Sequence, residues 1–374
     1  SEQRCLGNVV LGRVTRVLNK GNFLDPGEPV APGIPTAFHP WPADAPTNRL
    51  GLAQWITDPA NPLTARVAVN RVWGQLMGQA IVETEEDFGT QGSLPTYRPL
   101  LDWLAVSFQS PAPANGTGRD PLQPRLGWDF KGLVKLIVTS AAYQQSSVLT
   151  PDRQEKDPLN KWYSRAPRRR LDAETVRDQA LALSGLLSRK IGGPSVYPMQ
   201  PDGLWRAAFN GERSWTTSEG EDRYRRGIYT FWRRTVPYPS MATFDAPSRE
   251  SCTVRRQPTN TPLQAFVTLN DPVFVECAQA LGRWLALGSG SVADRVRRGL
   301  ERVQVRPASS QAVTELVRLY EAERDHYRDH AEEARRLSEE PLGPLPPGLT
   351  PADAAAWTTV GNVLLNLDGV LTRN

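Results

Sequence analysis

The sequence predicts a mainly α protein: a multi-helix globular domain with long Pro/Gly-rich loops and a small β element. Apolar residues recur at steps of three and four through most of the chain, which is the period of an amphipathic helix. Several prolines directly follow a capping residue, as in Asn61-Pro62, Thr261-Pro262 and Thr350-Pro351, a pattern typical of helix starts. The 33 Pro and 29 Gly among 374 residues exclude long coiled coils and smooth repeat arrays.

The first 47 residues predict a proline-rich N-terminal arm or connector. Short β-like pieces such as Arg16-Val17-Leu18 alternate there with Pro/Gly turns. Residues 48–374 are expected to form a single large helical domain, and a division into lobes 48–193 and 194–374 is left open.

The first helices are expected just after this arm. One begins near Asn48 and stops at Asp58-Pro59, and a second follows Asn61-Pro62. The second should carry Leu63, Val67, Trp73 and Met77 near one face. A third helix is expected where Leu100, Leu101, Leu104 and Phe108 recur at helical spacing. A fourth helix should begin at Trp128-Asp129. Residues Ser110–Leu126 between them indicate a surface insertion.

The second half mixes helices with an aromatic stretch. A helix capped by Asp172 should run to the stop at Gly192-Gly193-Pro194. Residues 227–232 have the most strand-like composition in the chain, so they predict the small β element, around Tyr224–Val236. Further helices are expected after Thr261-Pro262, after Asp271-Pro272, over Gln311–Leu337, and over a last segment containing Trp357, Val360, Leu364 and Leu367.

Charge and cysteine content exclude several classes of protein. Only six of the 44 basic residues are Lys, but the Arg residues are interleaved with acids, so a nucleic-acid partner is disfavoured. The three cysteines, Cys5, Cys252 and Cys277, form no C-x-x-C or C-x-x-C-H motif, which argues against structural zinc and attached haem. Cys252 and Cys277 could pair only if the fold brings them together. No apolar run is long enough to span a membrane. The first residues show no initiator Met or signal peptide, so we expect a C-terminal piece of a longer chain.

No familiar catalytic motif is present, which leaves open whether the chain is an enzyme. His326 and His330 could share a metal with Asp325 or Asp329, but a solvated helix face is favoured, and no metal site is predicted. Glu86 and Asp87, with Asp102, could supply an acid–base pair or serve as caps and Arg partners. The aromatic and Arg residues from Trp205 to Arg234 could stack on sugar or nucleotide, although a core role is favoured.

The remaining candidates are polar residues inside apolar helices. They are expected to bind a ligand or, with more weight, to bond loop backbone and fix the fold. These candidates are Arg66, Asn70, Arg71, Asn260, Gln264, Asn270 and Asp271.

Seven phrases occur in an order that carries a family resemblance. They are Asn48–Trp55, Asn61–Trp73, Glu86–Gly89, Leu101–Ala105, Gly127–Asp129, Arg169–Glu174 and Thr259–Ala265. With them the chain closely resembles the planctomycete-specific domain one family, a domain of unknown function at the C-terminal end of large planctomycete proteins. The sequence departs from the family pattern at Gly369-Val370 and at Lys20.

The resemblance implies which domains accompany this one in the polypeptide, but it implies no catalytic residues. Such domains typically follow a second domain of unknown function and often an N-terminal cytochrome c-like module in exported proteins. It therefore implies a non-catalytic accessory or interaction domain, with no cofactor in this segment, haem in an absent N-terminal domain, and a periplasmic or otherwise exported location. Its partners would be N-terminal domains of the same polypeptide, and a small-molecule or polymer ligand stays unspecified. The alternative is a hydrolase acting on extracellular polysaccharide or another polymer through a carboxylate pair.

Overall fold

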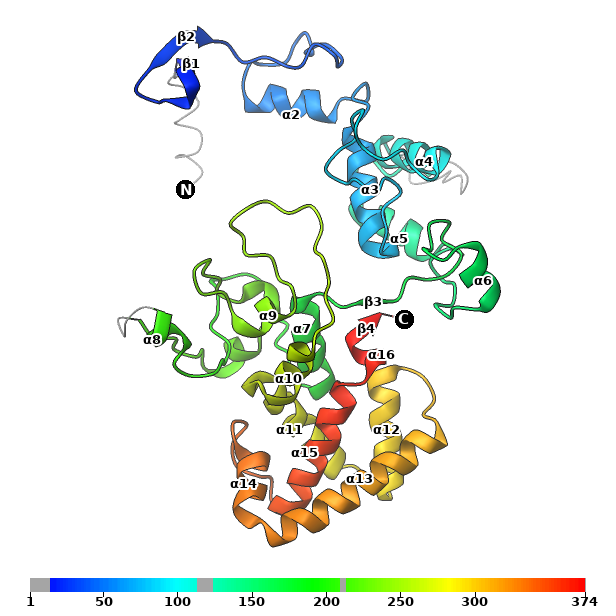
Figure 1. The fold of residues 1–374 in the computed structure, drawn as a ribbon, viewed down its shortest axis with the longest axis vertical. Helices are drawn as coiled ribbons and strands as arrows, with labels where there is room; N and C mark the ends of the chain where they lie inside the picture. The colour runs from blue at the N-terminus through cyan, green and yellow to red at the C-terminus, as the bar shows by residue number, and fades with distance from the viewer. Residues whose placement is uncertain (1–13, 113–123, 209–212, 374) are drawn as a thin grey trace. The chain divides into compact units, whose positions relative to one another are not determined.

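The fold is mainly helical, which confirms the predicted class (Figure 1). The computed structural model describes residues 14–112, 124–208 and 213–373. Cys5 and most of the predicted surface insertion lie outside these ranges. The chain divides into two compact units, which we call unit 1 (Ser1–Ala166) and unit 2 (Pro167–Asn374). The single domain over 48–374 stays a prediction.

Unit 1 begins with a two-stranded antiparallel hairpin. Strand β1 (Thr15–Leu18) pairs with β2 (Pro26–Val30). Both strands are almost fully exposed, and the Arg16 side chain donates a hydrogen bond to the Gly27 carbonyl at 2.9 Å. The β-like pieces predicted for the arm are therefore confirmed here.

The helices of unit 1 follow the caps expected from the sequence. Asn48 caps the first of them by accepting hydrogen bonds from the Leu50 and Gly51 amides, and Asp129 caps another by accepting from the Lys131 amide. Residues Val69, Leu104, Phe108, Leu133 and Ile137 pack into one buried cluster. The helices are α2 (Arg49–Thr57), α3 (Thr64–Met77), α4 (Arg98–Gln109), α5 (Phe130–Val138) and α6 (Pro151–Lys156).

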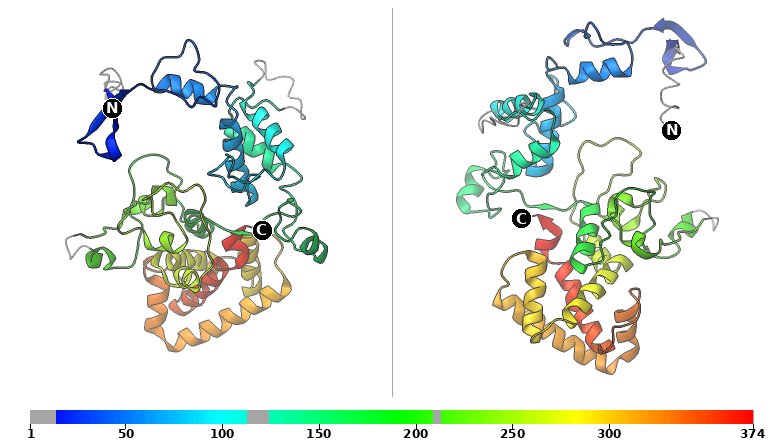
Figure 2. Two further views of the ribbon diagram at one scale, coloured as in Figure 1. Left: turned by 45° about the horizontal axis from the view of Figure 1, so that its top comes forward. Right: turned by 180° about the vertical axis from the view of Figure 1, so that it is seen from behind.

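The centre of unit 2 is a close helix pair. Helices α11 (Pro272–Ala286) and α15 (Pro351–Leu365) lie side by side in all views (Figures 1 and 2). A Cβ added at Gly282 would lie 2.7 Å from the Trp357 carbonyl, and one at Gly361 would lie 2.6 Å from the Ala278 carbonyl. Glycine is therefore required at both crossing points, because any side chain would collide with backbone.

Further helices surround this pair. The Tyr320 ring packs on the buried Trp357 ring with centroids 4.5 Å apart. The other described helices of unit 2, whether or not they contact this pair, are α7 (Ala173–Ser184), α8 (Leu204–Ala208), η2 (Gly220–Tyr224), η3 (Gly227–Tyr229), α9 (Pro239–Thr243), α10 (Pro262–Asn270), α12 (Val292–Gln304), α13 (Ser310–Asp329), α14 (Ala331–Glu339) and α16 (Asp368–Leu371). A short antiparallel pair, β3 (Arg169–Arg170) with β4 (Thr372–Arg373), joins the first and last described segments of the unit.

The strand predicted at residues 227–232 is wrong. The segment begins with η3, and Thr230 makes only an isolated bridge to Val196. Gly227 is pressed so closely against Met241 and Glu174 that a Cβ would lie 2.9 to 3.1 Å from their atoms. Its amide also donates to the Asp178 carboxylate at 2.6 Å, so tertiary contacts turn the backbone where composition favours a strand.

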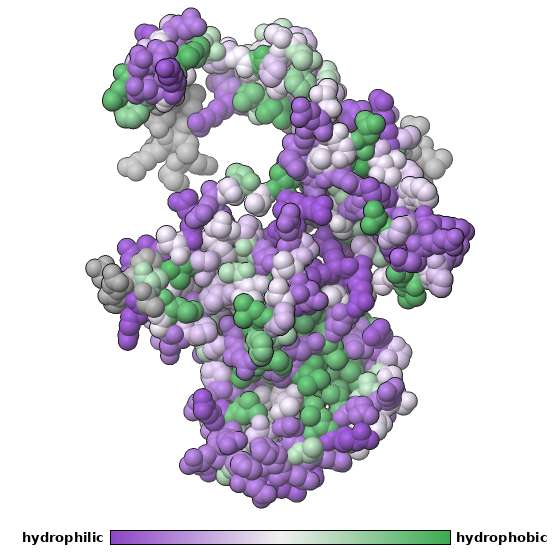
Figure 3. Space-filling model, viewed as in Figure 1, coloured by the Kyte–Doolittle hydropathy of each residue, from purple (hydrophilic) through white to green (hydrophobic). Residues whose placement is uncertain are grey.

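Two helix boundaries also differ from expectation. Helix α7 ends at Ser184, because Gly185 takes a left-handed conformation, and the Asp172 side chain makes no capping hydrogen bond. The helix expected over Gln311–Leu337 is two helices, α13 and α14, which meet at a non-helical His330. Hydrophilic side chains cover α13 along the lower border of the space-filling view (Figure 3).

Candidate functional site

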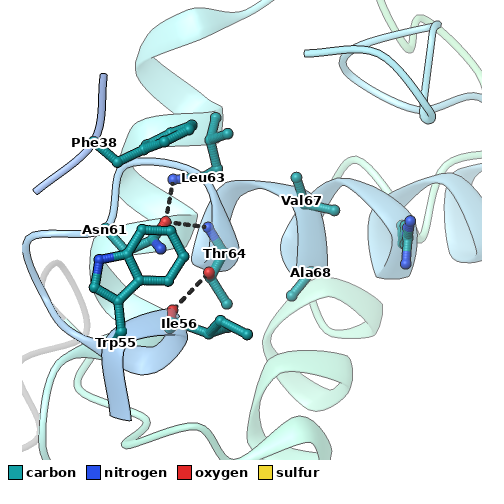
Figure 4. Close-up of a pocket in the computed structure, with 9 residues that line it drawn as sticks. Phe38, Trp55, Ile56, Asn61, Leu63, Thr64, Val67 and Ala68 are labelled. Atoms are coloured by element: carbon teal, nitrogen blue, oxygen red, sulfur yellow. Dashed lines mark hydrogen bonds between the residues drawn. The ribbon is translucent and has the colours of Figure 1, made fainter. Parts of the chain in front are cut away.

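A groove of about 490 Å³ opens in unit 1 between α2, the loop after it and α3 (Figure 4). We call it the α2–α3 groove. Its volume lies within the range of roughly 300–1,000 Å³ that is typical of ligand sites. The lining is largely apolar and consists of Phe38, Trp55, Ile56, Asn61, Leu63, Thr64, Val67, Ala68 and Arg71.

Trp55 forms one end of the groove and is held by the loop before α2. Its indole Nε1 donates to the His39 carbonyl at 3.0 Å, and the His39 imidazole Nε2 donates to the Trp55 carbonyl at 3.0 Å. The two rings also stack, with centroids 4.9 Å apart and planes within 10°. This double clasp fixes the loop and orients the Trp55 ring before any ligand arrives.

The polar side chains at the start of α3 are bonded to backbone groups, so they hold the fold and do not offer contacts to a ligand. The Asn61 side-chain oxygen accepts from the Leu63 and Thr64 amides at 3.0 and 3.2 Å. The Thr64 hydroxyl donates to the Ile56 carbonyl at 2.7 Å, and Figure 4 shows these bonds as dashed lines among the lining residues. The Asn61-Pro62 start signal is thus confirmed, and it also ties α2 to α3.

Among the described residues that line the groove, Arg71 is the one charged residue. It is exposed, and within the described part of the chain no hydrogen bond or ion pair engages its guanidinium. Arg66, on the same helix, is engaged twice: its side chain donates to Asp102 at 2.7 Å and to the Pro62 carbonyl at 2.5 Å. Of the two predicted arginines, therefore, only Arg71 faces a cavity with its donors available.

The other predicted residues of unit 1 have structural contacts. Asn70 is fully buried; its amide donates to the Val82 carbonyl at 3.0 Å, and its oxygen accepts from the Val82 amide at 2.8 Å. Asp87 accepts from the Gly89 amide at 2.7 Å within a turn, whereas Glu86 is exposed. Asp102 is paired with Arg66 and lies 3.6 Å from Arg98. None of these carboxylates lines the groove.

In unit 2 the predicted residues hold loops and helix ends. Gln264 is buried and donates to the Thr243 carbonyl at 3.0 Å, whereas Asn260 is exposed. Asn270 donates to the Phe266 carbonyl at 2.9 Å. Asp271 caps α11 by accepting from the Val273 amide at 3.1 Å. Burial raises the pKa of Asp271 to about 6, and the positive charge of Arg177 opposes this shift.

Sequence reasoning missed a network of buried charged residues in unit 2. Arg177 donates to the Arg225 and Arg223 carbonyls at 2.6 and 3.1 Å, and Arg223 pairs with Glu276 at 2.7 Å. Tyr224 donates to the same Glu276 carboxylate at 2.9 Å. Burial raises the pKa of Glu276, and burial beside Glu276 raises that of Tyr224 to about 12. A buried Arg on an otherwise apolar α7 face was the available signal.

The aromatic residues between Trp205 and Arg234 pack mainly on one another. Trp205 contacts Trp215 edge to face at 5.3 Å, and Tyr197 stacks on Phe231 at 4.9 Å. Trp205 is buried. Tyr197, Trp205 and Phe231 also line, with Arg213 and Arg233, an opening of about 490 Å³, so both the core role and the sugar or nucleotide surface stay predictions for this part of the sequence.

The remaining sequence candidates do not form a site in the described residues. His326 and His330 stack on each other at 4.2 Å, but no group of three or more His, Cys, Asp or Glu residues is placed to hold a metal within residues 14–112, 124–208 and 213–373. Cys252 is exposed and Cys277 is buried, and both are free thiols. No helix in the described ranges combines the length and apolar character needed to cross a bilayer.

Leu63 and Val67 do not share a face with Trp73 and Met77, as the sequence analysis expected. Trp73 and Met77 lie in the unit 1 core, whereas Leu63 and Val67 line the groove. The groove therefore uses a second apolar stripe of α3. Phe38, from the proline-rich arm, was also missed, because its contact with α3 depends on the loop path and not on helical period.

Comparison with known proteins gives one match. No curated protein and no solved structure matches the chain. The family model described as PSD1, a protein of unknown function (DUF1553), matches residues 48–320. The match covers most of the chain and starts at the Asn48 cap where the helical region begins. The chain therefore belongs to this family of proteins of unknown function.

Proposed function

We propose that the chain is a non-catalytic accessory domain of a larger exported polypeptide that also carries a cytochrome c-like module. In this proposal the α2–α3 groove is the surface that contacts another domain of the same polypeptide. The observation that carries it is the groove itself: an open, preformed apolar surface with one available cation and no carboxylate in its lining. Apolar surface open to solvent is a common mark of a binding site.

The carboxylates also support a non-catalytic role. A glycosidase needs two carboxyl groups about 5 to 10 Å apart across a cleft. Here Asp102 is paired with arginine, Asp87 closes a turn and Asp129 caps a helix. Glu83 pairs with Lys161 at 2.9 Å. Since these groups already have structural partners, no specific observation favours the hydrolase alternative.

The cytochrome c-like module and the exported location come from the family resemblance of the sequence. The absence of a C-x-x-C-H motif in this chain is consistent with haem being held elsewhere in the polypeptide. Burial of the groove by a neighbouring domain would remove the exposed Ile56 and the half-buried Phe38, Leu63 and Val67 side chains from water. The gain per side chain would be smaller than the roughly 1.5–3 kcal/mol of a fully exposed side chain that becomes fully buried.

The test is site-directed photo-crosslinking in the full-length parent protein. A benzophenone amino acid replaces Val67 in the groove or, as a control, the exposed Glu155 on α6. We expect the Val67 position to crosslink to peptides from another domain of the parent, and the Glu155 position to give far less of that product. Crosslinks confined to residues 1–374 at both positions would contradict the proposal.

A second experiment addresses catalysis and haem. The isolated chain should release no reducing sugar from polysaccharide, and deleting it from the parent should lower the haem content of the cytochrome c-like module. Hydrolysis by the isolated chain would support the hydrolase instead. If haem content is unchanged while the Val67 crosslinks persist, the groove contacts another domain without affecting haem incorporation.

A further inference from the structure

The charge of the α2–α3 groove specifies what can occupy it. Its walls offer rings and aliphatic side chains, and its only charged group is Arg71. The polar atoms at the other end are already engaged, because the Asn61 oxygen accepts two amides and the Thr64 hydroxyl donates to Ile56. An apolar ligand would gain nothing from the exposed Arg71 guanidinium, which would stay hydrated at the edge of the groove, and a cationic ligand would be repelled.

A carboxylate is the best-matched partner for this guanidinium. Arg presents its N–H donors in a planar fork that fits two carboxylate oxygens, and such charge-assisted pairs are stronger than neutral hydrogen bonds. Asp102 cannot serve, since it is held by Arg66 at 2.7 Å. Among the residues that the structure describes, no acidic one lines the groove, so the complementary charge would come with the ligand.

The spacing along α3 sets the distance between the two parts of the ligand. Thr64, Val67, Ala68 and Arg71 follow one another at helical steps of three, one and three residues, so they form one stripe. Trp55 and Leu63 form the apolar end of the groove, near Thr64. Seven residues at about 1.5 Å each place Arg71 about 10 Å along the helix from Thr64. An extended peptide rises about 3.3 Å per residue, so it covers this length in three residues.

We infer that the α2–α3 groove binds an extended peptide segment with an apolar side chain at the Trp55 end and, three residues away, an Asp or Glu whose carboxylate pairs with Arg71. This inference rests on the proposed function, because it names the chemistry of the segment that another domain would supply. It would apply equally to a segment presented by a separate peptide, which makes the recognition testable outside the parent protein.

The test measures fluorescence anisotropy of labelled peptides with the full 374-residue chain. Three peptides with the core Phe-Gly-Gly-X, flanked by Gly-Ser, carry Glu, Gln or Lys at X. We expect the Glu peptide to bind about tenfold more tightly than the Lys peptide, as one charge-assisted pair predicts. The variant Arg71→Glu should reverse this order. Because Arg71 is exposed, the variant should fold, and circular dichroism checks this.

Lys131→Glu is the matched control, since it makes the same charge change at an exposed position on α5 outside the groove lining. It should preserve the preference for Glu. Equal affinities for the three peptides, no detectable binding of any, or an unchanged order in Arg71→Glu would each overturn the inference. If Val67 still crosslinks to another domain of the parent in that case, the docking proposal survives and only the acidic-peptide chemistry fails.

Discussion

The two units use their polar side chains in different ways. In unit 1 the buried polar residues hold single loops: Asn70 binds both backbone groups of Val82, and Asn61 binds the first amides of α3. In unit 2 charged side chains are buried with each other, and Arg177 and Glu276 are each 1% exposed. Unit 1 thereby holds its loops with neutral amides, whereas unit 2 buries charged groups beside one another.

The difference follows from what each unit has to satisfy. In unit 1 a single amide side chain pairs the backbone of each of these two loops. The segment from Arg223 to Gly227 in unit 2 is bonded to α7 and α11, and Arg225 and Gly227 within it are buried. Arg177 supplies two of the missing donors, and Asp178 accepts from Gly227. Buried backbone groups need such partners, because an unpaired one costs about 1–3 kcal/mol.

The largest expected effect is the loss of the Asn70 clamp. Asn70→Ala should lower the free energy of unfolding by about 2–5 kcal/mol, because it leaves two buried backbone groups of Val82 without partners. Urea denaturation followed by circular dichroism measures this change. The exposed Asn270, whose amide bonds only within its own helix, is the control: Asn270→Ala should change stability by less than about 1 kcal/mol. A small effect at Asn70 would mean that its loop rearranges to find water.

Next in size is a pH effect at Asp271. Its pKa of about 6 lies above the unfolded value, so the folded state holds this proton more tightly. The stability of the wild type should therefore fall as pH rises from about 4 to about 6, by up to about 3 kcal/mol at roughly 1.4 kcal/mol per pKa unit. Asp271→Asn should lack this component while keeping the cap, which unfolding free energies at pH 4, 5, 6 and 7 would reveal.

Asp294 provides the opposite control for this experiment. It is exposed in the capping box of α12, where hydrogen bonds from Ser291 lower the pKa of its carboxyl. The stabilising contribution of Asp294 should be present above the unfolded pKa and be lost as pH falls through the folded one. This loss falls below about pH 4, so the unfolding free energies are also measured at about pH 2 and 3. The destabilisation caused by Asp294→Asn should shrink as pH falls through this range, whereas the effect of Asp271→Asn should change between about pH 4 and 6. A change of both variants in the same pH range would contradict the assignment of a buried, proton-retaining Asp271.

A smaller difference in stability is expected between two Gly→Ala variants, one in each unit. Gly282→Ala places a Cβ against the backbone of α15, so we expect a loss of about 1–3 kcal/mol from overpacking. In unit 1, Gly74→Ala meets the Ala80 Cβ at 3.1 Å, a looser contact that requires the backbone of Ala80 to shift by only a few tenths of an ångström. The gain in helix propensity, about 1 kcal/mol, should nearly offset it. Thermal unfolding of both variants tests the contrast, and equal losses would remove it.

The smallest effect is expected at the Arg66–Asp102 pair. Both side chains are about one-third exposed, so Asp102→Asn should cost less than about 1 kcal/mol in the free energy of unfolding. If Asp102 instead belongs to an active site, Asp102→Asn should abolish any activity found for the chain. A change of less than about 1 kcal/mol in the free energy of unfolding could not explain such a loss. Denaturant titration at low and high salt checks the first outcome, since salt should shrink the difference.

Much of the secondary structure could be predicted because its signals are local. A polar cap followed by proline fixes a helix start within a few residues, which is why α10, α11 and α15 begin at Pro262, Pro272 and Pro351. The apolar period of α4 likewise predicted its buried residues Leu101, Leu104 and Phe108. The structural role expected for the polar candidates held for Asn70 and Gln264, since an amide in an apolar helix needs a partner that water cannot provide.

Strand and boundary predictions failed where tertiary contacts outweigh local preference. Aromatic and β-branched residues at 227–232 favour a strand in isolation, but the contact of Gly227 with α7 turns the chain instead. Helix α13 ends one residue before His330, although the charged pattern continues through it. Periodicity alone does not reveal such a break.

The candidate site likewise has features that local sequence predicts and features that only tertiary contacts set. By itself the sequence determined several helix starts, the family resemblance and the presence of Arg71 on α3, because these depend on residues close together in the chain. Only the tertiary structure decided which arginine is engaged and which is available, and that Phe38, Trp55 and Val67 face one groove. Those outcomes depend on contacts between segments far apart in sequence, where the geometry of the folded backbone, and not residue spacing, sets which groups meet.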